Sequence, residues 1–212
     1  MKVLVISGGI GSGKSTVCHI LETEYGWPVY EADRRVKELY QEHPTLLSDI
    51  EKGLDASFRD DSGIFQPSLL ASRIFAEPKA LAVVESLVFP ILMDDFRGWK
   101  DGNQDREFLV LESATILEKP ELSSMWDYAV VVDAPVDVRV GRALMRGGIS
   151  RENIVARVDN QVMMNAISNG IIPDEVDYVI DNGGTYESLR INLSKCMDFL
   201  SERRCSSGER KS

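Results

Sequence analysis

Short apolar runs alternate along the chain with segments in which apolar residues recur at helical spacing. Five runs have the length of a β-strand, at residues 3–6, 27–30, 108–111, 128–132 and 178–180. Because these runs are apolar throughout rather than at alternate positions, both faces of each strand are predicted to be buried. The pattern therefore predicts an α/β fold in which helices cover both sides of a five-stranded parallel sheet.

The interval between the second and third strands, residues 34–106, is longer than one crossover needs. It contains helical patterns at residues 34–41, 67–75, 79–88 and 91–99. We predict a helical insertion here, over the sheet edge where open α/β folds bind ligands. The predicted domain covers residues 1–200, with its core at about 1–33, 107–138 and 176–200. Residues 201–212 form a polar end that we predict to be disordered.

Composition narrows the class of protein. A chain of 212 residues with 43% apolar and 27% charged residues is typical of a soluble globular domain. A net charge of −10 argues against a nucleic-acid partner, and no apolar stretch approaches the roughly 18 residues of a membrane span. Cys18, Cys196 and Cys205 form no C-x-x-C pair, which favours reduced thiols. We expect a cytoplasmic protein without a membrane partner, and we predict no particular oligomeric state.

Residues 7–16, SGGIGSGKST, place four glycines between the first predicted strand and a helical pattern beginning near Lys14. The segment satisfies the phosphate-loop pattern G-x-x-x-x-G-K-[ST], whose backbone N–H groups turn inward to bind phosphate. A strand-to-helix turn without a ligand is the alternative. The order of strand, loop and helix favours a P-loop NTPase fold and a nucleotide.

The phosphate loop also predicts individual contacts. Lys14 is expected to reach the β- and γ-phosphates of ATP, and the Ser15 hydroxyl to bind Mg²⁺, which usually keeps several waters. The loop residues expected to bind ATP are Gly9, Gly11, Ser12, Gly13, Lys14, Ser15 and Thr16. The dinucleotide fingerprint G-x-G-x-x-G fails, because Lys14 stands where its third glycine belongs.

Other segments favour a small-molecule kinase among P-loop proteins. The guanine-reading [NT]-K-x-D element and the transporter signature S-G-G-Q are both absent from the sequence. Asp33 follows the second predicted strand, at the sheet edge that the phosphate loop shares. Its carboxylate is a candidate to accept a proton from a substrate hydroxyl, or to cap a helix beginning at Arg34. The residues support both interpretations equally, and one residue can serve both roles.

Arginines are concentrated in the segment between the fourth and fifth strands. Arg139, Arg142 and Arg146 lie at helical i, i+3, i+7 spacing, and Arg151 and Arg157 follow. We predict a mobile lid over residues 139–165, in which Arg142 and Arg146 bind ATP and Arg142 stabilises the transition state. The alternative is a basic helix face that points into solvent.

Several motifs together resemble those of the dephospho-coenzyme A kinase family, which phosphorylates the ribose 3′-hydroxyl of dephospho-CoA with ATP. The family's T-G-G-I-G-S-G-K-S resembles residues 7–15, and its D-A-D resembles Glu31-Ala32-Asp33. Its R-I-F-x-x-P is present at 73–78, its P-L-L-F-E strand end resembles 111–118, and its A-D-x-V-I-x-N-x-G resembles 176–184. The resemblance spans most of residues 3–190 and implies an adenylate-kinase-like architecture.

The resemblance also implies roles for single residues. It makes Asp33 the base facing the 3′-hydroxyl and puts Asn182 on the adenine side of the ATP site. Pro67 and Phe89 stand where the family usually has Arg and His, which bears on acceptor binding. Arg73, Arg34 and Arg35 are candidate replacements. Phe89 is predicted either to stack on the acceptor's adenine or to pack in the core, and the core is favoured.

The sequence therefore predicts a Mg²⁺- and ATP-dependent kinase that converts dephospho-CoA to coenzyme A. Two other hypotheses remain: a P-loop kinase of another nucleoside-like or small hydroxyl acceptor, and a nucleotide-binding regulator without turnover. The presence of Lys14, Ser15 and Asp33 disfavours the regulator. Glu31 and Glu112 end two predicted strands, and their roles stay open.

Overall fold

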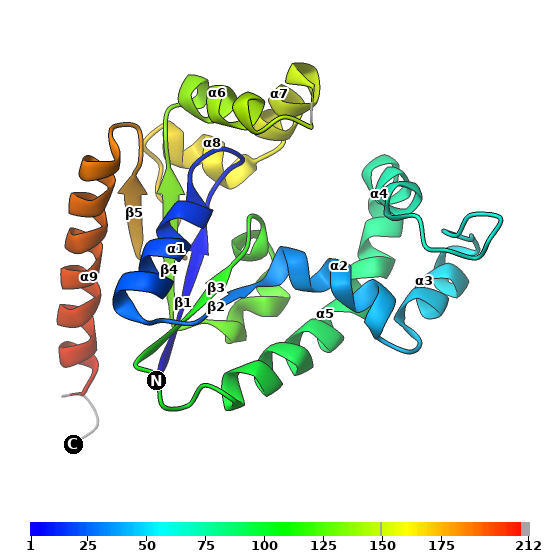
Figure 1. Ribbon diagram of the computed structural model, residues 1–212, viewed down its shortest axis with the longest axis horizontal. Coiled ribbons are helices and arrows are strands. Elements are labelled where there is room, and N and C mark those ends of the chain that lie inside the picture. Colours follow the sequence, from blue (N-terminus) through cyan, green and yellow to red (C-terminus); the bar gives the residue numbers. More distant parts are fainter. Residues whose placement is uncertain (149, 209–212) are drawn as a thin grey trace. The chain divides into compact units, whose positions relative to one another are not determined.

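The computed structural model describes residues 1–148 and 150–208, and it shows two compact units (Figure 1). The first unit consists of residues 1–29 together with the chain from residue 105 onward, and the second consists of residues 30–104. The second unit coincides within a few residues with the expected helical insertion at 34–106. The two units are described in turn.

A five-stranded parallel sheet forms the centre of the first unit (Figure 1). Its strands are β1 (Lys2–Ser7), β2 (Val29–Glu31, which spans the boundary between the two units in the sequence), β3 (Phe108–Glu112), β4 (Tyr128–Asp133) and β5 (Tyr178–Asp181). They lie in the order β2-β3-β1-β4-β5, with Ile6 of β1 opposite Glu112 of β3 and Val130 of β4. The predicted α/β class and parallel sheet are confirmed, and each predicted strand is present within two residues.

The middle strands are buried on both faces, as their unbroken apolar runs predict. Helices α1 (Lys14–Tyr25), α8 (Val162–Ser168) and α9 (Tyr186–Gly208) pack against strands of the sheet. Helices α6 (Val136–Arg146) and α7 (Arg151–Asp159) lie between β4 and α8 in the sequence and pack against each other. Two short 3₁₀ turns, η1 (Ile116–Glu118) and η2 (Pro120–Met125), lie between β3 and β4. Val17 and Leu21 of α1 join Leu189 and Leu193 of α9 in one buried cluster with the strands. This core fixes the strand ends from which the phosphate loop and α6 depart.

The second unit contains α2 (Ala32–Glu42), α3 (Leu46–Leu54), α4 (Pro67–Ala76) and α5 (Pro78–Asp101). Helix α5 buries one residue in every four, namely Ala80, Val84, Val88, Leu92 and Phe96, and packs against α2, α3 and α4. Two helices were predicted here, at 79–88 and 91–99, and the break between them was wrong. The apolar stripe continues past Pro90, so tertiary packing offsets the cost of proline in the helix interior.

Three further boundaries differ from the sequence predictions. Helix α2 begins at Ala32 rather than Arg34, and α3 was not predicted at all. Helix α9 continues to Gly208, so the expected disorder from residue 201 is not found over residues 201–208. Residues 209–212 of that expected tail lie outside the described residues.

The remaining composition-based expectations concern thiols and membranes. Cys18 and Cys196 are both buried, and burial raises the pKa of the Cys196 thiol to about 12. Cys205 lies where the side chains are not described. Among residues 1–148 and 150–208, no helix combines the length and the apolar character that crossing a membrane requires.

Candidate active site

The phosphate loop runs from the end of β1 into the first turn of α1. Gly13 occupies the N-cap position of α1 with φ of 100°, in the region that favours glycine. A Cβ on Gly13 would also lie 2.1 Å from Nδ2 of Asn182, so a side chain is excluded by both conformation and space. The missing Cβ therefore lets the Asn182 side chain approach the loop, while the glycine conformation turns the backbone as a phosphate-binding nest requires.

Asn182 fastens this loop to the sheet. The residue is buried at the end of β5, where its backbone N–H donates to the Asp133 carbonyl at 2.7 Å. Its side-chain Nδ2 donates to the Ser12 carbonyl, also at 2.7 Å. These contacts make Asn182 a support of the phosphate loop, a role that the sequence did not predict. Its expected role on the adenine side stays a prediction.

Lys14 lies folded over the loop. Its Nζ donates to the carbonyl oxygen of Gly8 at 2.7 Å and to that of Gly9 at 3.4 Å. Ser15 and Thr16 follow in the exposed first turn of α1, whose N-terminus carries a partial positive charge. Loop, lysine and helix end thus provide the kinds of group with which proteins bind anions.

Several buried donors near this loop have no hydrogen-bond partner within the described part of the chain. They are Ser12 Oγ, Arg142 Nη1, and all three side-chain nitrogens of Arg139. Arg142 Nη1 lies 4.0 Å from where a Cβ of Gly13 would be. Since buried polar groups in folded proteins are normally paired, donors gathered in this way indicate an anionic ligand.

The arginine stripe is divided by the structure. Arg139 and Arg142 lie on the side of α6 that meets the loop, whereas Arg146 is exposed in the last turn of α6. Arg139 was not among the predicted site residues, although its spacing from Arg142 placed both on one helix face. The burial of Arg139 depends on how α6 packs, which the sequence pattern does not show.

The predicted lid, residues 139–165, corresponds to most of α6, α7 and the start of α8. Val140 and Ala143 of α6 pack against Ile154 and Val158 of α7 in a separate small cluster. Gln161, just before α8, accepts a hydrogen bond from the Ile10 N–H of the loop at 3.3 Å. The segment is therefore a helical unit with its own core, tied to the loop, and its motion stays a prediction.

In the second unit, Asp33 is an exposed residue in the first turn of α2. Glu31, not Asp33, holds the N-cap position, so the capping interpretation of Asp33 was wrong. An acidic residue in a first turn still interacts favourably with the helix dipole. Glu31 itself pairs with Arg34 at 3.1 Å.

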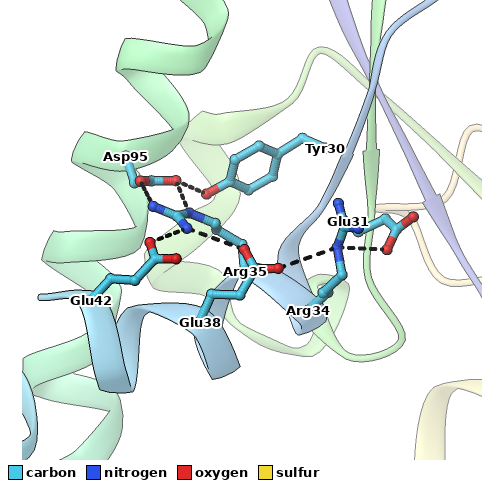
Figure 2. A network of polar contacts seen from close by, with 7 residues as sticks. All are labelled: Tyr30, Glu31, Arg34, Arg35, Glu38, Glu42 and Asp95. Carbon is cyan, nitrogen blue, oxygen red and sulfur yellow. Dashed lines mark hydrogen bonds and ion pairs between the residues drawn. The ribbon is translucent and has the colours of Figure 1, made fainter.

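A polar network surrounds this turn (Figure 2). Arg35 donates from Nε and Nη2 to the two carboxylate oxygens of Asp95 on α5, at 2.9 and 2.8 Å, and the Tyr30 hydroxyl donates to Asp95 at 2.6 Å. The Arg35 guanidinium, with the Tyr30 hydroxyl, lowers the pKa of Asp95 despite burial. Arg35 also pairs with Glu38 and Glu42. The network fixes the turn that presents Asp33, and it occupies Arg35.

Besides Asp33, the predicted acceptor-binding residues are Arg73 on α4 and Phe89 on α5. Arg73 is exposed and pairs with Glu77, the residue that follows α4, at 2.5 Å. Phe89 is partly buried on α5, which leaves its two predicted roles open. Pro67 is the first residue of α4, a position where proline suits a helix start. Arg73 and Arg34, both in exposed ion pairs, remain the candidate replacements for the missing basic residue.

Metal binding rests on a single predicted side chain. Among the described residues, no three His, Cys, Asp or Glu side chains are grouped so as to hold a metal ion. The Ser15 hydroxyl, exposed at the start of α1 beside Lys14, fits one position on a Mg²⁺ that is otherwise bound by phosphates and water.

A parallel sheet with a phosphate loop after β1, and with arginines of α6 beside that loop, defines a P-loop nucleotide-binding protein. Solved structures share this fold. A crystal structure of a Thermus thermophilus protein has a TM-score of 0.75 and 26% identity, covering 94% of this chain and 97% of its own. Acinetobacter baumannii shikimate kinase, at 14% identity and a TM-score of 0.52, covers 96% of this chain and 94% of its own.

The chain belongs to the dephospho-CoA kinase family. The family model matches residues 2–187. A dephospho-CoA kinase of Chlorobaculum tepidum is 34% identical over 200 residues, 92% of this chain and 93% of the relative. One from Porphyromonas gingivalis is 36% identical over 161 residues, 76% and 78% of the two chains. The protein is thus an ATP-dependent kinase of coenzyme A biosynthesis, which sets aside the regulator and the altered-acceptor hypotheses.

Proposed function

We propose that this chain phosphorylates the ribose 3′-hydroxyl of dephospho-CoA through the residues of the phosphate loop, α6 and the first turn of α2. The observation that carries the proposal is the group of buried, unpartnered donors beside the loop, Ser12 Oγ and Arg142 Nη1. Phosphate oxygens of ATP satisfy these donors, and Lys14 exchanges its loop carbonyl contacts for the β- and γ-phosphates.

The reaction itself needs positioning and charge neutralisation more than covalent catalysis. The 3′-hydroxyl oxygen forms a bond to the γ-phosphorus, the bond to the β–γ bridging oxygen breaks, and ADP leaves. In our proposal the Asp33 carboxylate accepts the hydroxyl proton, and Arg142 and Lys14 stabilise the charge on the transferring group. Arg146 is assigned to ATP only on closure of the lid, because its side chain is exposed.

The Ser15 hydroxyl would hold Mg²⁺, which would supply charge neutralisation for the phosphates of ATP. On the acceptor side we assign Arg73 to the pyrophosphate of dephospho-CoA and Phe89 to the wall of that site. The dependence on ATP and the family's place in metabolism support a cytoplasmic location.

The test measures ADP release by the full chain with ATP, MgCl₂ and one of three additions: dephospho-CoA, a panel of nucleosides, or no acceptor. We expect turnover with dephospho-CoA alone, coenzyme A as the product by mass spectrometry, and loss of turnover when EDTA removes Mg²⁺. ATP binding without phosphorylation of dephospho-CoA at any concentration would contradict the proposal.

A further inference from the structure

Arg139 of α6 is the one charged residue in the buried class among the described residues, with an exposed fraction of 0%. None of its three side-chain nitrogens has a hydrogen-bond partner among residues 1–148 and 150–208. Burying an ionised group without partners is costly, so native proteins rarely keep one without a compensating charge. The position of Arg139 therefore requires an explanation that its own surroundings do not supply.

The side chain lies directly against the phosphate loop. A Cβ on Gly9 would be only 2.1 Å from Arg139 Nη1, and a Cβ on Gly11 would be 2.0 Å from the Arg139 carbonyl oxygen. Any side chain at Gly9 would displace the guanidinium. Because these two glycines have no side chains, Arg139 and its buried positive charge lie against the backbone of the phosphate loop.

Asp133, at the end of β4, is the carboxylate that influences Arg139 most, but it forms no hydrogen bond with it. Burial lowers the pKa of Arg139 more than Asp133 raises it. Burial likewise raises the pKa of Asp133, which interacts with the Ser168 hydroxyl at 3.4 Å and with the charge of Asp181. The charge of Arg139 is therefore only partly balanced inside the protein.

We propose that Arg139 is a phosphate-binding cation of the nucleotide site, which acts across Gly9 on the β- and γ-phosphates and adds to the charges of Lys14 and Arg142. This inference rests on the proposed function. In a buried site the effective dielectric constant is low, so a full charge acts over several ångströms without direct contact. The phosphates of ATP provide the compensating charge that the side chain lacks.

The proposal makes two predictions of opposite sign for Arg139→Met. The affinity for Mg-ATP should fall by roughly 10- to 100-fold, that for ADP by less, and that for AMP by about twofold or less, because attraction grows with phosphate charge. The melting temperature of the unliganded protein should stay unchanged or rise, since an uncompensated buried charge is removed. A purely structural arginine would instead lower the melting temperature and leave the ratio of ATP to AMP affinity unchanged.

The experiment is calorimetric titration of the full-length wild type and variant with the three nucleotides, together with thermal melts without ligand. Arg190→Met is the matched control, because Arg190 pairs with Glu24 at 2.6 Å on the surface between α9 and α1. It should bind all three nucleotides as the wild type does. If Arg139→Met does not fold, Arg139→Gln takes its place with the same expectations.

Equal losses for ATP and AMP, or unchanged affinity with a lower melting temperature, would overturn the role of Arg139 while leaving the proposed function intact. Failure of the wild type to bind ATP would overturn both. A loss confined to ATP and ADP, with a melting temperature no lower than that of the wild type, supports the inference.

Discussion

The arginines beside the phosphate loop differ from those of the second unit in how their positive charge is paired. Beside the phosphate loop, the three side-chain nitrogens of Arg139 and Nη1 of Arg142 are buried and lack hydrogen-bond partners in the described part of the chain. In the second unit, residues 30–104, the arginines Arg34, Arg35 and Arg73 are paired with carboxylates of the same unit. Under the proposed function, a polyphosphate supplies the negative charge that the arginines beside the loop lack, whereas the arginines of the second unit must exchange existing ion pairs for contacts with the acceptor.

This difference predicts unequal costs of mutation. Removing a buried, uncompensated cation should weaken ligand binding without lowering the stability of the unliganded protein. Removing a paired arginine or aspartate should instead lower stability or binding because its former partner is left without a hydrogen bond. The predictions below test this contrast, beginning with the residue assigned to the chemical step.

The largest effect is expected from Asp33→Asn, which keeps the size of the side chain and removes the proposed base. We expect kcat to fall by roughly 10²- to 10⁴-fold, with little change in melting temperature. Steady-state kinetics with dephospho-CoA measures the change. Asp49→Asn is the matched control, since Asp49 also lies in the first turn of a helix, α3. A fall in stability with kcat retained would assign Asp33 a structural role only.

A second test compares the arginines of α6. Arg142→Met should lower kcat by about 10- to 100-fold, the equivalent of one charge-assisted hydrogen bond to the transferring phosphoryl group. The exposed Arg146, changed in the same way, should have a smaller effect. Equal kcat values for the two variants would remove the distinction between buried and exposed arginines.

Arg73→Ala should raise KM for dephospho-CoA by about 3- to 10-fold and leave KM for ATP unchanged. The variant should fold as the wild type does, because the exposed ion pair of Arg73 with Glu77 contributes little to stability. Arg97→Ala removes a comparable exposed pair, with Asp94 on α5, and should change neither constant. A parallel rise in both KM values after Arg73→Ala would argue against a role specific to the acceptor.

The smallest effect on turnover is expected at Asp95. Its pKa is lowered in the folded protein, so its contribution to stability is present above the unfolded pKa and is lost as pH falls through the folded pKa. Asp95→Asn should lower the free energy of unfolding at pH 7 by about 1–3 kcal/mol. Denaturant unfolding of both proteins between pH 7 and pH 3 should show the difference shrinking in acid. A constant difference would contradict the charge pairing with Arg35.

Much of the fold follows from local sequence patterns. Continuous apolar runs predicted the five strands. The glycine loop with Lys14 and Ser15 predicted the P-loop class of the fold and the position of the phosphate loop, because the signals lie within about ten residues. Helix α3 was missed although Leu46, Leu47 and Ile50 have helical spacing, and Pro90 was given too much weight against the stripe of α5.

The candidate site was predicted less completely than the fold. Asp33 and Arg142 could be proposed from motifs, but the support that Asn182 gives to Ser12 joins residues 170 positions apart. The burial of Arg139 likewise arises only when α6 packs on the loop. Such contacts depend on tertiary packing, which a one-dimensional pattern does not contain.

The most direct test of the account is the turnover of Lys14→Ala with ATP, Mg²⁺ and dephospho-CoA. The account predicts that most of kcat is lost, because Lys14 stabilises the negative charge that lies between donor and acceptor. The melting temperature without ligand should stay close to that of the wild type, because Lys14 contributes little to the stability of the fold. An unchanged kcat would contradict the assignment of the phosphate loop as the nucleotide site.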